Sequence, residues 1–223
     1  MGPFIVLGLH RSGTSLVANT LRCLGVKMGD SFPRTTRHNS RGYWEDTEFI
    51  RMNVRILKMA GGKWSKPPAH AGILVAGDFY ADDVKTLLER KVQGSLLVKG
   101  QRWGWKDPRT CLTIPIYHKI LTEQLGIMPH YVVAQRSRGA MIDSLVRRHR
   151  GSKTAKWAAM TDIYQERLDS FLQTLNAPVH YVKFNELVSR RTANNEITKL
   201  GWFTGRKRFR QQRDKAMKEI NFR

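Results

Sequence analysis

The amino-acid sequence predicts an α/β fold in which helices cover both faces of a central parallel sheet. Short apolar runs alternate with segments of helical pattern along the chain, and this alternation is typical of parallel sheets that are buried on both sides. The chain has 223 residues, 41% of them hydrophobic, which suits one large core better than two small ones. We therefore expect a single domain over residues 1–223, with a basic helical segment at about residues 204–223.

The first half of the chain is expected to begin with a strand, a loop and a helix. Residues 4–8 form a short apolar run that ends at a glycine, as buried strands often do. Apolar residues then recur at helical spacing from Gly13 to Leu24, and Gly25 ends the pattern. The further segments expected in this half are a polar loop over 30–45, a helix over 46–60, a loop over 63–77, a helix over 81–93 and one or two short strands over 96–106.

The second half of the chain continues the alternation. Residues 130–135 and 179–184 are short apolar runs, and they predict two further strands. The spacing of apolar residues predicts helices around these strands. The helices are expected over 114–125, 138–149 and 154–175, followed by basic helical sequence to the end.

Positive charge is the compositional outlier. The chain carries 39 Lys and Arg against 18 Asp and Glu, a formal net charge of +21. A field of this kind attracts anions such as nucleotides, acidic polymers and nucleic acid. The charge therefore predicts an anionic ligand without indicating a fold.

Signals of a disulfide framework, a metal site or a membrane segment are missing from the sequence. No metal-ligand spacing surrounds Cys23 or Cys111, so we expect two buried thiols and no metal. No run approaches the roughly 20 apolar residues of a membrane span. Because His10 and Arg11 interrupt the apolar run near the N-terminus, the segment does not have the pattern of a secretory leader. We expect a cytoplasmic protein.

The segment Gly8–Ser15 carries the clearest chemical signal. It reads GLHRSGTS, a G-x-x-x-x-G-x-S frame between the expected strand and helix, and this is close to the P-loop pattern G-x-x-x-x-G-K-[ST]. Such a loop points backbone N–H groups at a phosphate-like anion, and the helix N-terminus adds partial positive charge. Thr14 stands where a P-loop has lysine, and the cation is Arg11 instead. The sequence predicts a three-layer, P-loop NTPase-like fold with an anion site that needs no metal.

Two segments of the chain resemble the phosphate-binding elements of the sulfotransferase family. Residues 10–15, HRSGTS, are similar to the family's 5′-phosphosulfate loop, and Arg136 with Ser144 eight residues later is similar to its 3′-phosphate site. The resemblance implies that 3′-phosphoadenosine 5′-phosphosulfate is the sulfuryl donor. The residues that it assigns to donor binding are Arg11, Ser12, Gly13, Thr14, Ser15, Arg136 and Ser144.

Two further segments suggest catalytic residues. Residues 105–109, WKDPR, resemble the family's Lys-Asp-Pro element, which implies that Lys106 neutralises charge on the transferring group. Residues 39–45 resemble a Gly-Tyr-aromatic-Glu segment, and Glu45 is our candidate for the general base. We expect Arg11 and Lys106 to stabilise the charge of the transition state. Glu48, His38 and His10 remain alternatives for the base, and Glu45 could instead only stabilise a helix start.

The chain also departs from the family's pattern near its end. Phe184 stands where the family often has tyrosine, and the C-terminal Gly-Asp-Trp-Lys type of segment is absent, with Gly205-Arg206-Lys207 as a weak substitute. The sequence therefore does not indicate how the adenine would be enclosed.

The expected activity is sulfuryl transfer to an acceptor hydroxyl or amine by in-line attack. A P-loop kinase or other nucleotide phosphotransferase is the first alternative, and Thr14 in place of lysine disfavours it. A non-enzymatic, basic nucleic-acid-binding domain is the second, because the charge of +21 would suffice for non-specific phosphate contacts. The expected partners are the nucleotide donor and an unidentified acceptor that could itself be acidic.

Overall fold

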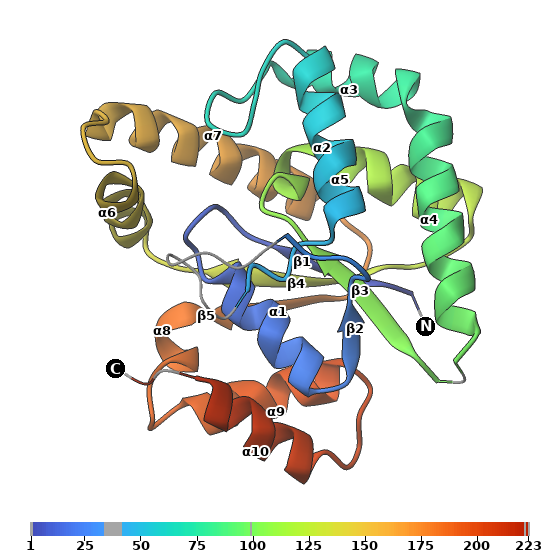
Figure 1. Cartoon of the computed structure of the whole chain (residues 1–223), viewed down its shortest axis with the longest axis vertical. Helices are drawn as coiled ribbons and strands as arrows, with labels where there is room; N and C mark the ends of the chain where they lie inside the picture. Colours follow the sequence, from blue (N-terminus) through green and yellow to red (C-terminus); the bar gives the residue numbers. More distant parts are fainter. Residues whose placement is uncertain (1, 34–41, 99, 221, 223) are drawn as a thin grey trace.

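The computed structural model describes residues 2–33, 42–98, 100–220 and 222. In this part of the chain five parallel strands form one sheet in the order β2-β3-β1-β4-β5. The strands are β1 (Phe4–Leu7), β2 (Val26–Met28), β3 (Arg102–Lys106), β4 (His130–Gln135) and β5 (Val179–Lys183). Helices lie on both faces of this sheet (Figure 1), which confirms the predicted α/β fold.

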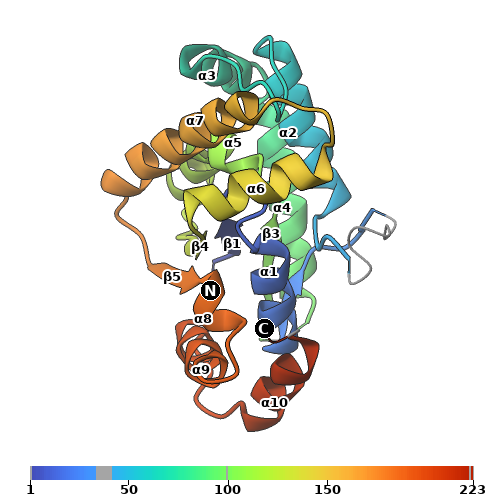
Figure 2. The same cartoon turned by 90° about the vertical axis from the view of Figure 1, so that its left-hand side faces the viewer.

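The helices divide between the two faces of the sheet (Figures 1 and 2). One face carries α1 (Thr14–Cys23), α8 (Phe184–Leu187), α9 (Ala193–Phe203) and α10 (Arg210–Glu219). The other face carries α2 (Thr47–Met59), α3 (His70–Phe79), α4 (Ala81–Leu96), α5 (Thr110–Lys119), α6 (Arg138–Arg148) and α7 (Thr154–Gln173), with a π-helical turn (Ile120–Gln124) after α5.

Alternating strand side chains build a separate apolar core on each face. In β1, Phe4 and Val6 pack toward α1 and α9, whereas Ile5 and Leu7 pack toward α5 and α7. All four side chains are fully buried, as the two-residue period of a central parallel strand requires. The result is the three-layer arrangement that the sequence predicts.

Two local features differ from what the sequence predicts. The segment over 63–77 is not a loop throughout, because α3 begins at His70; the prolines before it, Pro67 and Pro68, are compatible with a helix start. The strand β2 was not predicted, because its three residues are too few to show a period. The region 96–106 holds one strand, as predicted, and this strand begins at Arg102 because α4 continues to Leu96.

The C-terminal helix α10 packs against α1. Ala216 and Ile220 are buried in the same core as Val17 and Leu21, so the basic segment contributes apolar contacts despite its charge. Cys23 and Cys111 are both buried thiols, and burial raises the pKa of Cys111 to about 12. None of the helices in the described ranges has the length and apolarity that crossing a bilayer requires.

Candidate functional site

The predicted site residues meet at the carboxyl edge of the sheet. Arg11 follows β1, Lys106 ends β3 and Arg136 follows β4. The strands are parallel and in register, with Val6 opposite Lys106 and Val132, so their carboxyl ends lie side by side. Ligands of open α/β sheets bind at this edge.

The loop Gly8–Gly13 has the backbone of an anion cradle. Gly8, Arg11 and Gly13 have φ angles of 146°, 71° and 101°, which turn successive N–H groups inward. Arg11 accepts this left-handed conformation although it has a side chain, at a cost of roughly 1 kcal/mol. Gly13 cannot be replaced without movement, because a Cβ there would lie 2.3 Å from the ring of Phe184.

A buried hydroxyl in the loop is suited to an incoming ligand. Ser12 is 1% exposed, and its Oγ has no hydrogen-bond partner among the residues that the structure describes. An unpaired buried hydroxyl costs about 1–3 kcal/mol, and an anion held by the loop would remove that cost. The cradle and this hydroxyl therefore fit a phosphate-like group.

The two predicted phosphate-binding elements are in direct contact. Arg11 Nε donates to Ser144 Oγ at 2.9 Å, and Arg136 Nη1 donates to the carbonyl oxygen of Arg11 at 2.9 Å. The guanidinium of Arg136 also lies over the ring of Phe184, 4.6 Å from its centroid. Ser144 lies two turns inside α6, yet it faces the loop, which gives a physical reason for its distance from Arg136 in the sequence.

A cavity of about 430 Å³ opens between the loop, the end of β4 and α6. We call it the loop cavity. Among its lining residues are Arg11, Ser15, Trp44, Arg136, Ser144, Arg147 and Phe184. Burial lowers the pKa of Arg11, and the neighbouring Arg148 lowers it further. Arg147 lowers this pKa as well, so both arginines at the end of α6 lie close enough to act on Arg11.

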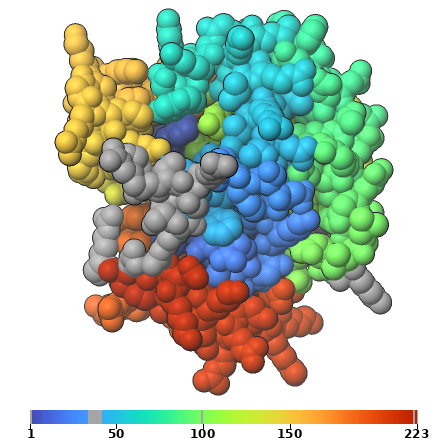
Figure 3. Space-filling model, in the orientation of Figure 1, coloured from blue at the N-terminus to red at the C-terminus, as the bar shows by residue number. Residues whose placement is uncertain are grey.

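A second cavity of about 420 Å³ shares Arg11, Thr14 and Ser15 with the first. We call it the aromatic cavity, because four rings line it: His10, Tyr43, Trp64 and His149. Its charged lining residues are Arg11, Glu45, Lys106, Arg109 and Arg148. In Figure 3 a hollow opens between the yellow atoms near residue 150 and the cyan atoms of the first half, with dark-blue atoms of the N-terminal segment at its base.

Lys106, in the lining of the aromatic cavity, connects Ser15 at the end of the loop to Glu45. Its Nζ lies 2.7 Å from Glu45 Oε1 and 3.2 Å from Ser15 Oγ. The lysine is 1% exposed, and burial lowers its pKa although the pairing with Glu45 opposes the shift. Arg109 Nη1 lies 3.9 Å from Glu45 and 2.7 Å from Asp107. The three predicted catalytic residues, Arg11, Glu45 and Lys106, thus line one cavity.

The alternatives for the general base lie in different places. His10 lines the aromatic cavity, whereas Glu48 lies outside it and pairs with Arg90 and Lys91 at 2.6 Å each. His38 lies outside the described residues, as do residues 39–41 of the segment that suggested Glu45.

Lys91 is the centre of an ionic cluster in which Lys91 and Asp46 are buried and Asp30 and Glu48 are partly exposed. Its Nζ lies 2.6 to 2.7 Å from carboxylate oxygens of Asp30, Asp46 and Glu48. These three form the only acidic group near metal-ligand spacing in the described ranges, and the lysine already supplies its cation. Asp46 also accepts from the N–H of Glu48 and so caps α2. The cluster therefore anchors the residue that follows Glu45.

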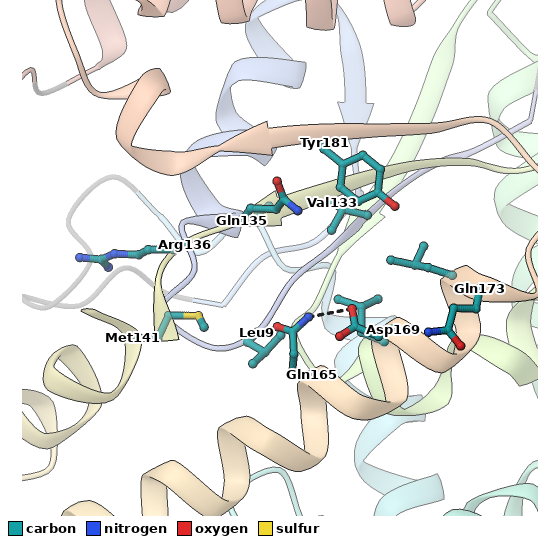
Figure 4. A pocket seen from close by; sticks show the side chains of 12 residues that line it. Leu9, Val133, Gln135, Arg136, Met141, Gln165, Asp169, Gln173 and Tyr181 are labelled. Carbon is teal, nitrogen blue, oxygen red and sulfur yellow. Dashed lines mark hydrogen bonds between the residues drawn. The ribbon is translucent and has the colours of Figure 1, made fainter. Parts of the chain in front are cut away.

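A third cavity, of about 540 Å³, lies between α7 and the strands β4 and β5. Its polar rim consists of amides, a carboxylate and a phenol, with Gln165 bonded to Asp169 at 2.8 Å. Arg136 is its only cationic lining residue, and Figure 4 shows that side chain pointing away from the others. This cavity is therefore poorly suited to an anion.

Sequence reasoning missed several lining residues. Arg147 of the loop cavity, and Trp64 and Arg148 of the aromatic cavity, stand in no motif, whereas Trp44 is the aromatic residue of the segment that suggested Glu45 but was given no role. Arg147 and Arg148 follow one another at the end of a predicted helix, where cations are common for reasons of the helix dipole alone. Only the three-dimensional structure shows that Arg147 lines one cavity and Arg148 the other.

The fold is that of sulfotransferases. No protein-family model matches the sequence, and no curated protein is similar enough to count as a match.

Three solved structures share the fold over nearly the whole chain. Sulfotransferase STF1 of Mycobacterium tuberculosis H37Rv is 13% identical, with 97% of this chain and 70% of that chain covered and a TM-score of 0.51. The sulfotransferase domain of the olefin synthase of Synechococcus PCC 7002 is 18% identical, with coverages of 91% and 72% and a TM-score of 0.52. The sulfotransferase domain of the curacin biosynthetic pathway is 16% identical, with coverages of 99% and 79% and a TM-score of 0.56. At these identities the likeness establishes the fold alone.

Proposed function

We propose that this protein is a sulfotransferase, which moves the sulfuryl group of 3′-phosphoadenosine 5′-phosphosulfate to an acceptor hydroxyl or amine. The observation that carries the proposal is the shared wall: Arg11, Thr14 and Ser15 line both the loop cavity and the aromatic cavity. A donor in one cavity and an acceptor in the other would meet at this wall. The shared fold supports the same class of reaction.

The loop cavity fits the donor at both of its charged ends. The curled backbone, Arg11 and the unpaired hydroxyl of Ser12 suit the 5′-phosphosulfate. Arg136 and Ser144, which reach the loop from β4 and α6, suit the 3′-phosphate, because a guanidinium can bind a phosphate through two donors. The expectation that the two basic elements serve one nucleotide thus agrees with their contact.

The residues of the shared wall, together with Glu45 and Lys106 of the aromatic cavity, suit in-line sulfuryl transfer. The donor supplies an activated sulfuryl group, whose bond to the 5′-phosphate oxygen breaks as the acceptor oxygen or nitrogen bonds to sulfur. Glu45 would take the acceptor's proton. Arg11 and Lys106 would stabilise the negative charge on the equatorial and leaving oxygens, and Ser15 would hold Lys106 in place through their 3.2 Å contact.

The decisive binding test is calorimetry with adenosine 3′,5′-bisphosphate in the presence of a metal chelator. We expect micromolar affinity for this product, because the proposed site uses cationic side chains and backbone N–H groups in place of a metal. A kinase would instead bind a nucleoside triphosphate and need Mg²⁺. A nucleic-acid-binding domain would show steeply salt-dependent DNA binding and no affinity for the bisphosphate. Either of these results would overturn the proposal.

The role of Glu45 can be tested separately. Glu45→Gln keeps the shape of the side chain but removes its basicity, so turnover should fall by about 10²–10⁴-fold while bisphosphate affinity changes little. Asp162→Gln is a control, since Asp162 lies in an exposed pair with Arg138. Full transfer activity of Glu45→Gln would remove this residue from the mechanism and leave His10 as the candidate among the described alternatives.

A further inference from the structure

Two adjacent arginines at the end of α6 serve different cavities. Arg147 lines the loop cavity and does not line the aromatic cavity, whereas Arg148 lines the aromatic cavity and does not line the loop cavity. Neighbouring residues of a helix point about 100° apart, so one helical turn can supply a cation to each site. Arg147 is on the side proposed for the donor. Arg148 faces the other cavity, where the acceptor would bind, and the group that it would bind there is still to be identified.

The cations of the aromatic cavity differ in how they are paired. Lys106 is matched by Glu45 at 2.7 Å and Arg109 by Asp107 at 2.7 Å. Arg148 has no such carboxylate partner in the described part of the chain; its Nη2 donates to the hydroxyl of Tyr43 at 3.2 Å, and its guanidinium lies 5.8 Å from the centroid of that ring. Its charge is available to an anion.

Positive charge dominates this cavity. Four cations line it against the single carboxylate of Glu45. The two histidines in the lining, His10 and His149, supply no negative charge that would offset these cations. Burial lowers the pKa of His10 far below its usual value, and the cations around it lower the pKa further. The pKa of His149 is also lowered, by burial and by Arg148. The excess of positive charge is therefore carried by arginine and lysine and persists across the neutral pH range.

The remaining walls suit a flat or apolar body. The ring centroid of Trp64 lies 4.6 Å from that of His10 and 5.8 Å from that of His149. The apolar lining is completed by Pro33, Ile50, Pro108 and Leu145. Aromatic side chains of this kind stack on planar groups. An acceptor with a planar body and a separate anionic group would match both features.

We propose that the aromatic cavity takes an acceptor that carries its own anionic group, such as a carboxylate, phosphate or sulfate, and that Arg148 is the residue that recognises it. The inference rests on the proposed function and extends it to the substrate class. A guanidinium already inside a partly desolvated cavity can form a bidentate, charge-assisted pair with such a group. The unpaired charge of Arg148 thus selects acidic acceptors over neutral ones.

The test compares two phenols that differ in charge. Para-hydroxyphenylacetate and its neutral amide, para-hydroxyphenylacetamide, are titrated by calorimetry into protein saturated with adenosine 3′,5′-bisphosphate. We expect the carboxylate to bind the wild-type protein about tenfold more tightly, the effect of one charge-assisted hydrogen bond. Arg148→Gln should abolish this preference while leaving the affinities for the bisphosphate and for 3′-phosphoadenosine 5′-phosphosulfate within about twofold of the wild type.

Arg147→Gln is the matched control, because it removes the same charge one residue away. It should weaken bisphosphate binding and preserve the preference for the carboxylate probe. Equal affinities of the two probes, no binding of the carboxylate, or a preference that survives in Arg148→Gln would each overturn the inference. So would selective loss of phosphosulfate binding in Arg148→Gln, since Arg148 would then serve the donor. Failure of the proposed function is distinct, because the wild-type protein would not bind the bisphosphate at all.

Discussion

The loop cavity and the aromatic cavity adjoin one another, but they are built from different parts of the molecule. The loop cavity depends on main-chain geometry, with three residues at positive φ between β1 and α1. The aromatic cavity depends on side chains from separate segments, among them Tyr43, Trp64 and Arg148. A backbone cradle binds any ligand with the right charged group, whereas a wall of side chains can be altered one residue at a time.

This difference suits the two ligands that we propose. The donor would be the same in every turnover, and a site built from backbone N–H groups keeps its shape when surface residues change. The acceptor is the variable partner, and several residues that line its cavity, such as Tyr43, Trp64 and Arg148, lie outside the strands of the sheet. Four predictions sharpen this comparison, beginning with the largest expected effect.

The largest effect concerns the anchor of Glu45. Lys91→Met leaves the buried carboxylate of Asp46 without its cation, whereas Asp30 and Glu48 keep Lys27 and Arg90 as partners. The free energy of unfolding should fall by about 3–5 kcal/mol, the cost of one buried charge that has lost its partner. Chemical denaturation measures this loss. Arg55→Met is the control, because its pair with Asp83 is about half exposed on both sides (51% and 51%), and it should cost less than about 1 kcal/mol. Equal losses of free energy in the two variants would show that the Lys91 cluster stabilises the fold no more than an exposed ion pair does.

The next effect concerns the residue that both cavities share. Arg11→Ala removes a cation from the shared wall and its bond to Ser144, so single-turnover transfer should fall by about 10²–10³-fold. Arg11→Lys should recover only part of the rate, since lysine keeps the charge but not the planar set of donors. A full recovery would mean that charge alone matters at this position.

A smaller effect should be confined to the loop cavity. Arg136→Ala should weaken adenosine 3′,5′-bisphosphate by about 10–100-fold, the value of a charge-assisted hydrogen bond, and change adenosine 5′-monophosphate affinity by less than about threefold. Calorimetry with both nucleotides separates the two phosphates. Arg138→Ala, whose exposed guanidinium pairs with Asp162, is the control. Equal weakening of both nucleotides would place Arg136 away from the 3′-phosphate.

The smallest effect concerns pH. Burial, with Arg109 and Lys106, lowers the pKa of His10 well below 6.5, so the unfolded chain takes up a proton near that pH and the folded chain does not. The contribution of neutral His10 to the free energy of unfolding is fully present above about pH 6.5 and is lost as the pH falls below that value.

His10→Gln should therefore flatten the fall of stability below that pH, by at most about 1.4 kcal/mol per pH unit. The midpoint of thermal unfolding, followed from neutral to mildly acidic pH, measures the slope. The exposed His70 provides a control variant, His70→Gln. An unchanged slope in His10→Gln would show that the histidine takes up its proton in the folded state.

The two cavities also differ in how far the sequence could predict them. The glycines, the cation and the helix start of the loop are contiguous, so their pattern is visible in residues 8–15. Arg136 and Ser144 were identified by a spacing that matches a known family. In the aromatic cavity, Lys106 was predicted from a contiguous segment, but Trp64 and Arg148 come from separate elements with no motif and reach the cavity only in the folded chain.

The fold itself followed from periodicity, and its errors have local causes. The strands of the sheet centre, β1 and β4, are continuous apolar runs that stand out in the sequence. The edge strand β2 is short, and its middle residue, Lys27, is exposed, so it lacks that signal. Helix α3 follows two prolines, which act equally well as loop markers and as a helix start.

The shared wall has a thermodynamic consequence. Because Arg11 lines both cavities and also bonds to Ser144, a ligand that reorients its guanidinium changes what the other ligand meets. Such coupling is reciprocal, so whatever factor the nucleotide applies to acceptor affinity, the acceptor applies to nucleotide affinity. The side chain of Arg11 would then set how strongly the binding of each partner affects the binding of the other.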